Sequence, residues 1–495
     1  MKFLKSGAID IDRMLEYPDE LRECLANVAI GLNAGMFVTG GAVRSWLTGL
    51  PAKDLDITVD ADGIAFARDL ALKLGGAFVM LDNEEGVARV VWRDIIIDVS
   101  EFREGTKNIT DDLCKRDFTI NAMAVALDPA DAGLQPPFKV IDPTDGLHDL
   151  ENTIIRTTSS DVFKTDPLRL IRAYRFMATL GAALEPETKG LIVKSRDLLR
   201  FSAPERISHE LHQIMDSSDA HRSLSAMAAS GLFFVVFPEL EKGVNQVQPI
   251  SHHLDVFGHS MAALCEMEKL TKRPDMFFPG RGHEFRAYLE NGVRVRRLKW
   301  AALFHDLGKP DTFKKRDGRI TFYGHDQTGA FQFIKIGRRL RWTREDIRNI
   351  ALFIKLHMWL FHLNNARLKT GITSRACLKL VKAAGEDIKG LFLLALADSL
   401  ACKGPGRPLG MEEGLCELYE QVDQVNRENI KPVLLSPRLL TGHDLKNIFG
   451  LKPGPIFGKI LSGLEEARVS RQVQTRDDAL HWVKSFLVRQ DECNF

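Results

Sequence analysis

Two aspartates placed two residues apart, Asp54 and Asp56, are the first side chains whose types and spacing could do chemistry. The stretch Asp54–Val59 alternates polar and apolar residues, which predicts a strand with both carboxylates on one face. Paired carboxylates suit Mg²⁺, which binds one or two of them together with substrate phosphates. A third carboxylate, Asp98, lies in the β-branched stretch Ile95–Val99. We predict these three as catalytic residues, and the first two as Mg²⁺ ligands.

A glycine corner precedes these aspartates in the chain. Met36–Thr39 predicts a short strand that stops at Gly40 and Gly41, where a helix begins. Glycines let the backbone approach a phosphate closely, and a helix N-terminus offers free N–H groups and the positive end of a dipole. Arg44 adds a fixed positive charge. Either signal alone is common by chance, but together they predict a triphosphate site.

Two further segments concentrate polar side chains that could bind a nucleotide. The first, Arg116–Ala124, reads R-D-F-T-I-N-A-M-A. The second, Asp166–Phe176, predicts a helix in which Arg169, Arg172 and Arg175 recur every three residues as a polar stripe on one flank. We predict all three arginines to be nucleotide-binding. The aspartate–proline pair that opens this segment is typical of a helix start, so capping is an alternative role for that aspartate.

A histidine series in the second half of the chain could hold divalent cations. His305 and Asp306 are adjacent at the predicted end of an apolar helix, where Gly308 and Pro310 follow. Imidazole and carboxylate together suit divalent transition metals. The candidate ligands, in chain order, are His259, His305, Asp306, His325, His357 and Asp398. For most other histidines a structural role is the better interpretation, and His252 stays ambiguous.

The composition is that of an ordinary globular protein. The chain has 495 residues, which predicts roughly three or four domains. With 67 Lys+Arg and 66 Asp+Glu, any nucleic-acid binding must come from local patches. The seven cysteines include no C-x-x-C pair, so the sequence predicts neither a zinc knuckle nor a disulfide framework. The N-terminus lacks an apolar signal region and no apolar run spans a bilayer, so we expect a cytoplasmic protein.

The elements that must position these residues differ between the two ends of the chain. Further strands are predicted at Phe78–Leu81 and Ala88–Trp92, with a helix at Ile64–Leu74 between strands, which indicates one small mixed sheet. After about Gly146 the strand signals fade. Helical spacing then covers Asp166–Leu180, Pro204–Met215 and Ser223–Ala229, and helix follows helix from His252 to about Lys403. The Gly/Pro-rich stretch Gly404–Pro408 predicts a linker before a helical tail.

Taken together, the motifs resemble the signature set of class II tRNA nucleotidyltransferases and bacterial poly(A) polymerases. The resemblance rests on G-G-x-V-R…D-x-D, R-D-F-T-I-N-A-M-A and D-P-L-R-L-I-R-A-Y-R-F. The histidine series is similar to the HD phosphohydrolase superfamily, a domain carried by longer bacterial members. We therefore expect an α+β fold in four parts: a mixed-sheet nucleotidyltransferase head (1–145), a helical neck (146–245), an HD-type helical body (246–403) and a helical tail (404–495).

The resemblance also implies roles for individual residues. By this comparison Gly40, Gly41 and Arg44 hold the triphosphate, Arg116, Asp117 and Asn121 contact ribose and phosphates, and Asp166 with Arg169 reads the base. A carboxylate only accepts hydrogen bonds and a guanidinium only donates, so such a pair favours C and A over U and G. The chain departs from the family at Ser45 and Thr165, where Asp and Glu are usual. These departures bear most on the choice between C and A.

The leading hypothesis is template-independent addition of C and/or A to the 3′ end of tRNA, from CTP and ATP, with Mg²⁺. It includes versions that add only CC or only the terminal A. The HD domain implies a divalent transition metal and phosphatase or phosphodiesterase activity. No membrane or protein partner is indicated.

Two alternatives stay open on the sequence alone. One is a poly(A) polymerase acting on general RNA 3′ ends. The other is an HD phosphohydrolase whose head only binds nucleotide or RNA. A non-catalytic RNA-binding module is disfavoured, because simple binding does not need two sets of metal ligands. The basic stretches Arg294–Lys299 and Arg338–Arg344 are a candidate tRNA track or, alternatively, a solvated surface.

Overall fold

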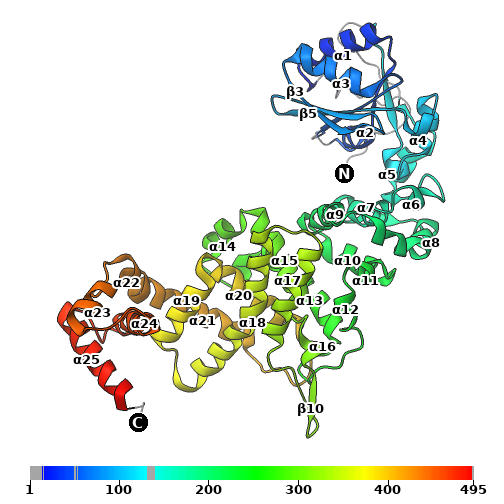
Figure 1. Ribbon diagram of the computed structural model, residues 1–495. Coiled ribbons are helices and arrows are strands. Elements are labelled where there is room, and N and C mark those ends of the chain that lie inside the picture. The colour runs from blue at the N-terminus through cyan, green and yellow to red at the C-terminus, as the bar shows by residue number, and fades with distance from the viewer. Residues whose placement is uncertain (1–13, 15, 50–51, 53, 131–139, 493–495) are drawn as a thin grey trace. The chain divides into compact units, whose positions relative to one another are not determined.

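The computed structural model describes residues 14, 16–49, 52, 54–130 and 140–492, and it separates into two compact units. The first unit is Met1–Val236 and the second Phe237–Phe495 (Figure 1). The finer four-part division stays a prediction. The N-terminal residues on which the signal-peptide expectation rests lie outside the described part. None of the described helices is both long and apolar enough to span a bilayer.

One mixed sheet organises the beginning of the first unit. Its strands run in the order β3-β4-β5-β2-β1-β6-β7, and only β2 and β5 pair in parallel. The strands are β1 (Met36–Thr39), β2 (Asp54–Val59), β3 (Ala77–Asp82), β4 (Val87–Trp92), β5 (Ile95–Glu101), β6 (Ala124–Leu127) and β7 (Val140–Ile141). The five predicted strands are all present. The sheet's centre, β5-β2-β1, carries the candidate chemistry.

Helices cover this sheet because their apolar residues recur on one face. In α3 (Gly63–Leu74), Phe66, Leu70 and Leu74 are buried at helical spacing. This helix packs on β4 and on α1 (Asp19–Leu32), and Figure 1 shows the two helices together on the sheet. The short α2 (Gly40–Leu47) starts directly where β1 ends. Asp62 caps α3 by accepting from Ala65 N at 2.8 Å.

The remainder of the first unit is mostly helical, but the expectation of an all-helical neck is wrong at one place, where β8 (Ile154–Ile155) and β9 (Ala183–Leu184) pair in parallel. Its principal helices are α7 (Arg169–Leu180), α9 (Pro204–Asp216) and α10 (Ala220–Ala229), and α7 packs on both of the others. Shorter helices link them: α4 (Ile109–Cys114), α5 (Gly146–Glu151), α6 (Val162–Thr165), α8 (Pro186–Ser195) and α11 (Leu232–Val236). The start of α7 comes three residues later than the sequence predicts, because Asp166 has extended backbone geometry.

The second unit is a helical bundle followed by smaller helices. The bundle contains α13 (Val256–Lys272), α15 (Gly292–Phe304), α17 (His325–Arg339), α18 (Arg344–Thr370) and α20 (Ile388–Ala401). The tail helices α23 (Gly442–Phe449), α24 (Pro455–Val469) and α25 (Arg476–Glu492) enclose their own apolar cluster. Helix α19 (Ser374–Ala384) packs against α24, and α21 (Met411–Val425) against α18 and α20. The most apolar helix, α20, is buried nearly all round.

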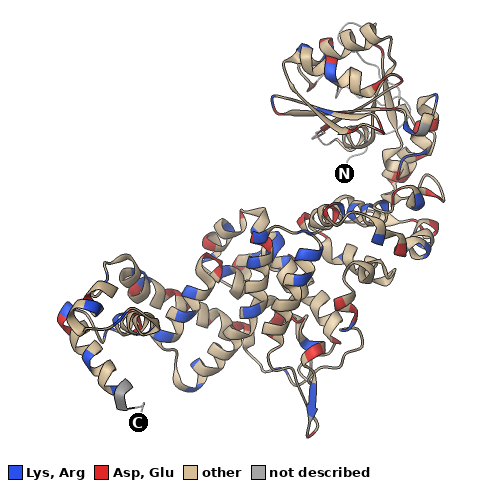
Figure 2. Cartoon of the chain, viewed as in Figure 1, with Lys and Arg blue, Asp and Glu red and all other residues tan. Residues whose placement is uncertain are grey.

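The expectation of uninterrupted helices from His252 to Lys403 is wrong at one place. The strands β10 (Lys314–Arg316) and β11 (Arg319–Thr321) form an antiparallel hairpin. Figure 2 shows this hairpin carrying basic residues. Charged side chains hide the apolar alternation that marks a strand. The missed signal is the dipeptide Asp317-Gly318, whose φ values of 48° and 76° suit a tight hairpin turn.

Candidate functional site

A cavity of about 590 Å³ in the first unit gathers every residue that was predicted for the catalytic head. The members come from β2, β5, α2 and α7, from the loop after α4, from the short 3-10 turn Thr119–Asn121 and from the segment before α7. They are Gly40, Gly41, Arg44, Asp54, Asp56, Asp98, Arg116, Asp117, Asn121, Asp166, Arg169, Arg172 and Arg175. The predicted catalytic, phosphate-binding and base-reading groups therefore share one space.

The acidic side of this cavity lies on neighbouring strands. The parallel register pairs Asp56 with Asp98, and Gly41 N donates to Asp56 Oδ2 at 3.1 Å. Burial and the neighbouring Asp98 charge raise the pKa of Asp56 above its ordinary value. Asp54 lies on the same strand and is exposed. Crowded carboxylates of this kind fit a divalent cation, whose charge would offset their repulsion.

The third predicted carboxylate has a partner that the sequence analysis missed. Asp98 accepts from Arg89 Nε at 2.7 Å and Nη2 at 2.8 Å. The two residues are directly opposite in the antiparallel register of β4 and β5. Arg89 thus occupies both oxygens of Asp98, which leaves Asp54 and Asp56 as the better-placed cation ligands. The register of the two strands was the only signal for this pair.

The glycine corner combines a left-handed backbone conformation with close packing. Gly40 has φ 64°, a backbone conformation that side-chain-bearing residues rarely adopt. A Cβ there would lie 3.3 Å from Arg116 Nη1 and 3.3 Å from Asp56 Oδ2. The first N–H groups of α2 lie beside the acidic side chains, where Gly40 N donates to the Met123 carbonyl at 3.3 Å and Gly41 N to Asp56 Oδ2 at 3.1 Å. This arrangement suits a bound phosphate next to a cation.

A chain of hydrogen bonds connects four of the predicted nucleotide-binding residues. Arg172 donates to Asp117 Oδ2 from Nε at 2.9 Å and from Nη2 at 2.6 Å. Asn121 Nδ2 donates to Asp117 Oδ1 at 3.0 Å, and Asn121 Oδ1 accepts from Arg44. Although burial opposes its charge, Arg172 and Asn121 hold the pKa of Asp117 well below the usual range. Asp117 in this structure orients two residues that face the cavity.

Two residues that were not predicted as site residues, Asp112 and Thr58, hold Arg116 in place. It donates to Asp112 Oδ2 at 2.9 Å and to Thr58 Oγ1 at 3.0 Å. Both Arg116 and Asp112 are buried. Burial, opposed by Asp112, lowers the pKa of Arg116 to about 10, so it stays charged at neutral pH.

An aromatic ring that the sequence analysis missed lies among three arginines. The Phe176 ring centroid is 5.0 Å from the Arg44 guanidinium carbon, 5.6 Å from that of Arg172 and 3.9 Å from that of Arg175. The electron-rich face of an aromatic ring attracts such cations. Glu210 on α9 accepts from Arg175 Nε at 2.6 Å. Burial and the Arg175 charge lower the pKa of Arg44 to about 10. The positive charges of the three arginines therefore outweigh the negative charges next to them.

The predicted base-reading pair is held by neighbours on both sides. Asp166 Oδ1 accepts from Leu168 N at 3.1 Å, although the N-cap residue of α7 is Leu168 and not Asp166 as the capping interpretation expected. Its other oxygen accepts from Arg206 Nη2 at 3.0 Å. Arg169 Nη1 lies 3.3 Å from Thr165 Oγ1 and 3.4 Å from the Lys115 carbonyl. The residue that departs from the family pattern is therefore in direct contact with the arginine it would orient.

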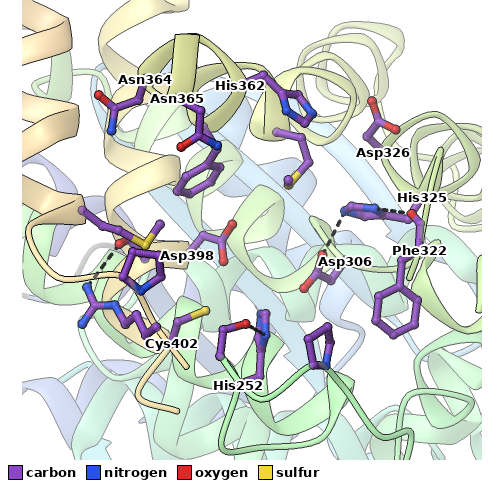
Figure 3. Close-up of a pocket in the computed structure, with 18 of the residues that line it drawn as sticks. His252, Asp306, Phe322, His325, Asp326, His362, Asn364, Asn365, Asp398 and Cys402 are labelled. Atoms are coloured by element: carbon purple, nitrogen blue, oxygen red, sulfur yellow. Dashed lines mark hydrogen bonds and ion pairs between the residues drawn. The ribbon is translucent and has the colours of Figure 1, made fainter. Parts of the chain in front are cut away.

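The second unit brings all six predicted metal ligands into one buried cluster. His259 Nε2 lies 3.0 Å from Asp398 Oδ1 and 3.2 Å from His305 Nε2. Asp306 Oδ2 lies 3.1 Å from His305 Nε2. In Figure 3 the carboxylates of Asp306 and Asp398 face the same space. A second group, Asp306 with His325 and His357, adjoins the first and shares its aspartate.

Backbone carbonyls orient three of these imidazoles. Nδ1 of His305, His325 and His357 lies 2.8, 2.8 and 2.6 Å from the carbonyl oxygen three residues earlier in the chain. Holding Nδ1 in this way turns Nε2 towards the cluster, as in many histidine metal sites. The described residues therefore include groups that fit metal ions, and two cations are compatible with the two sets.

The electrostatics of the cluster support the same interpretation. Burial opposes a charge on His305, but Asp306 and Asp398 raise its pKa to about 10. Burial and the neighbouring His325 lower the pKa of His357 to about 3. Lys309 Nζ lies 2.6 Å from Asp306 Oδ2, one turn after the HD doublet. The buried carboxylates therefore attract the positive charges of His305 and Lys309, and they would attract a bound cation in the same way.

The basic stretches differ from the expectation of a tRNA track. Arg294 pairs with Glu386 at 3.0 Å and Arg297 with Asp346 at 2.6 Å. Lys299, only 4% exposed, donates to Glu268 at 3.1 Å. These three residues are ion-paired within the second unit, so a fully solvated surface does not describe Arg294–Lys299, and contact of either basic stretch with tRNA stays a prediction.

Three protein-family models match successive stretches of the chain. The family described as Poly A polymerase head domain matches residues 36–156. The HD domain family matches residues 256–401, and tRNA nucleotidyltransferase domain 2 matches residues 426–483.

Curated relatives match over nearly the whole chain. An A-adding tRNA nucleotidyltransferase of Deinococcus radiodurans is 35% identical over 91% of this chain and 95% of its own. A CC-adding tRNA nucleotidyltransferase of Geobacter sulfurreducens is 28% identical over 94% of each chain. Among solved structures, the CCA-adding enzyme of Thermotoga maritima complexed with tRNA shares the fold, with a TM-score of 0.63, 21% identity and coverage of 98% of this chain and 100% of that one.

Proposed function

The chain belongs to the tRNA nucleotidyltransferase family, and from this premise we propose that it adds adenosine from ATP to tRNA that ends in CC. The observation that carries the proposal is the single cavity that joins Asp54, Asp56, the glycine corner and the Asp166/Arg169 pair. The preference for A follows the identity over nearly the whole chain, which is 35% to an A-adding relative and 28% to a CC-adding one. Addition of CC or of the whole CCA end is the alternative within the family.

The residues divide the work by their chemistry. The start of α2 and the cations Arg44, Arg172 and Arg175 bind the triphosphate of the incoming nucleotide. Asp54 and Asp56 would hold Mg²⁺, which supplies charge neutralisation at the phosphates and activation of the attacking 3′-hydroxyl when bound. Asp117 keeps Arg172 and Asn121 in position.

Base choice follows from hydrogen-bonding capacity. Adenine presents an exocyclic amine beside a ring acceptor, which matches the acceptor Asp166 and the donor Arg169. Guanine and uracil place a carbonyl opposite the carboxylate and leave polar groups of this half-buried pair without partners. Each such mismatch costs about 1–3 kcal/mol, which is roughly 5- to 150-fold in discrimination.

We test the proposal with tRNAs that end at the discriminator base, at C and at CC, each given one nucleoside triphosphate at a time. The proposal predicts extension of the CC end by ATP alone. Extension of the discriminator end by CTP would instead assign CC addition. Runs of A on an unrelated RNA would assign a poly(A) polymerase.

Matched variants separate transfer from binding. Asp54→Asn with Asp56→Asn is expected to abolish incorporation. Asp94→Asn, in the exposed turn between β4 and β5, serves as the control and should retain it. No incorporation by the unaltered chain on any RNA end would contradict the proposal.

A second function is favoured by the buried His/Asp cluster of the second unit. We propose metal-dependent hydrolysis of phosphate mono- or diesters there, with His259, His305, Asp306, His325, His357 and Asp398 as ligands. Lys309 is placed to bind a phosphate oxygen. Hydrolysis of bis(p-nitrophenyl) phosphate with Mn²⁺, Co²⁺ or Ni²⁺ tests it, and Asp306→Asn should abolish it. Because tRNA and free nucleotides are cytoplasmic substrates, we propose the cytoplasm as the site of both activities.

A further inference from the structure

Two side chains outside the HD ligand set face the same cleft. His252 lies just before α13, the helix that carries His259, and Cys402 directly follows α20, one turn after Asp398. Helices α13 and α20 pack closely on each other. In the view of Figure 3, His252 and Cys402 lie together next to Asp398 and Asp306. The cleft has a volume of about 490 Å³ and both side chains line it.

The geometry joins these two residues to one of the HD ligands. One ligand atom each of His252, His259 and Cys402 lies within 4.8 Å of the other two. The rings of His252 and His259 meet edge to face at 4.8 Å. Ser251 Oγ lies 3.1 Å from His252 Nδ1 and fixes that ring. Ligands of a tetrahedral zinc-like cation are about 3.3–3.8 Å apart, so modest side-chain rotation would let all three bind one ion.

The thiol has no other evident task. Cys402 is 9% exposed, is not in a disulfide, and its Sγ makes no hydrogen bond with any residue that the structure describes. A thiol and two imidazoles are a softer ligand set than the imidazole and carboxylate groups of the HD cluster.

We infer that His252, His259 and Cys402 form a third cation position, which selects thiophilic divalent ions such as Co²⁺, Zn²⁺ and Cd²⁺ over Mg²⁺ and Mn²⁺. Binding breaks the S–H bond, forms a sulfur–cation bond and releases one proton to solvent. Because His259 belongs to both sets, filling this position removes a ligand from the HD cluster. The functional consequence, inhibition by soft ions, rests on the proposed phosphohydrolase activity, whereas the binding itself does not.

The binding test uses the full chain, freed of metal by a chelator and titrated with Co²⁺ alone. A cobalt–thiolate bond gives a near-ultraviolet charge-transfer band that nitrogen and oxygen ligands do not give. The unaltered chain is expected to show this band, and Cys402→Ser to lose it. Cys377→Ser is the matched control, because Cys377 is also buried but lies on α19. Saturation with Co²⁺ without the band, or the same band in Cys402→Ser, would overturn the inference.

A second variant keeps the inference testable if Cys402→Ser does not fold. His252→Gln retains the thiolate and removes one imidazole. We expect the charge-transfer band to persist. The Co²⁺ concentration that gives half of the maximal band should rise at least about tenfold, which is the effect expected when a metal site loses one supporting residue. An unchanged titration would exclude His252 from the position.

The last arm separates this inference from the phosphohydrolase proposal. In Mn²⁺-supported hydrolysis of bis(p-nitrophenyl) phosphate, added Zn²⁺ or Cd²⁺ should inhibit the unaltered chain at least about tenfold more strongly than Cys402→Ser. A cobalt band without any hydrolysis supports the cation position and contradicts the phosphohydrolase. Hydrolysis that soft ions inhibit equally in both proteins contradicts the shared use of His259.

Discussion

At the scale of single residues, the contact between Arg169 and Thr165 controls how firmly the base-reading guanidinium is held. A hydroxyl oxygen at 3.3 Å accepts one weak hydrogen bond, whereas the carboxylate usual at this position would form an ion pair. The Lys115 carbonyl, at 3.4 Å, is the other acceptor. The arginine is therefore restrained mainly by neutral groups, which leaves its direction sensitive to small changes.

Replacing Thr165 with Val removes this acceptor without changing the side chain's shape. We expect kcat/KM for ATP to fall about three- to tenfold, the scale of one hydrogen bond, and discrimination against GTP to fall with it. Thr179→Val, at the other end of α7, removes a hydroxyl that bonds only the Arg175 carbonyl and serves as the control. Equal values for the two variants would show that Thr165 does not position Arg169.

Asp117 gives a prediction about pH. Although it is buried, Arg172 and Asn121 hold its pKa below the ordinary value, so the folded state favours its charged form. The stability it contributes is complete above about pH 5 and is lost as the pH falls towards the folded-state pKa. At pH 7, Asp117→Asn should lower the free energy of unfolding by about 2 kcal/mol. The difference from the unaltered chain should shrink between about pH 4 and pH 2, measured by calorimetry.

Asp197→Asn is the control for this measurement. It loses only an ion pair with Arg200 whose two side chains are each 68% exposed. Pairs of this kind contribute little, so neither the free energy of unfolding nor its pH profile should change measurably. A constant difference between Asp117→Asn and the unaltered chain down to pH 2 would contradict the assignment.

The candidate site residues could be predicted from the sequence, whereas most of their hydrogen-bond and ion-pair partners could not. The motif residues of the head converge as predicted, because strand period and helix period place them on the faces that the structure shows. Arg89, Phe176 and Glu210 were missed, since each acts through a register or a helix crossing that no single segment encodes. Whether the predicted residues bind nucleotide stays a prediction.

At the scale of elements, the junction of β1 and α2 depends on Gly40. Alanine there would adopt an unfavourable positive φ and press a Cβ against Arg116 and Asp56. Gly49 provides a matched control, because its φ is 73° and nothing lies within 4 Å of an added Cβ. Both variants should lose about 1 kcal/mol of stability from backbone strain.

Only Gly40→Ala is expected to impair the reaction. Because the added methyl group lies at the phosphate corner, kcat/KM for ATP should fall at least about tenfold, whereas Gly49→Ala should remain within about twofold. Steady-state incorporation on a CC-ending tRNA measures both. Equal losses in the two variants would assign the effect to strain and not to the corner.

The prediction of elements succeeded where periodicity was long and failed where elements were short. The α3, α9 and α10 helices and the central strands appear close to their predicted limits. The pairs β6–β7, β8–β9 and β10–β11 were missed, because two to four residues carry too little pattern to be recognised. The start of α7 was placed too early, since Asp166 lies outside the helix in an extended conformation.

At the scale of the whole molecule, the two candidate sites lie in separate compact units with separate cores. We therefore expect their variants to act independently. Asp56→Asn should abolish incorporation and leave phosphodiester hydrolysis within about twofold, and Asp306→Asn should do the reverse. The double variant should lose both, with stability changes that add within about 0.5 kcal/mol. Loss of both activities in either single variant would show that the sites are coupled.

The ring of Phe176 with its three guanidinium neighbours has a practical consequence for handling the protein. Arg172 and Arg175 are ion-paired with Asp117 and Glu210, so these three arginines exceed the two carboxylates by one positive charge, which a bound polyanion would offset. Preparations from cell extracts should consequently retain endogenous nucleotides, seen as an elevated ratio of absorbance at about 260 to about 280 nm, until a high-salt wash removes them. Crystals grown from washed protein would then have this site free for soaking with a nucleotide.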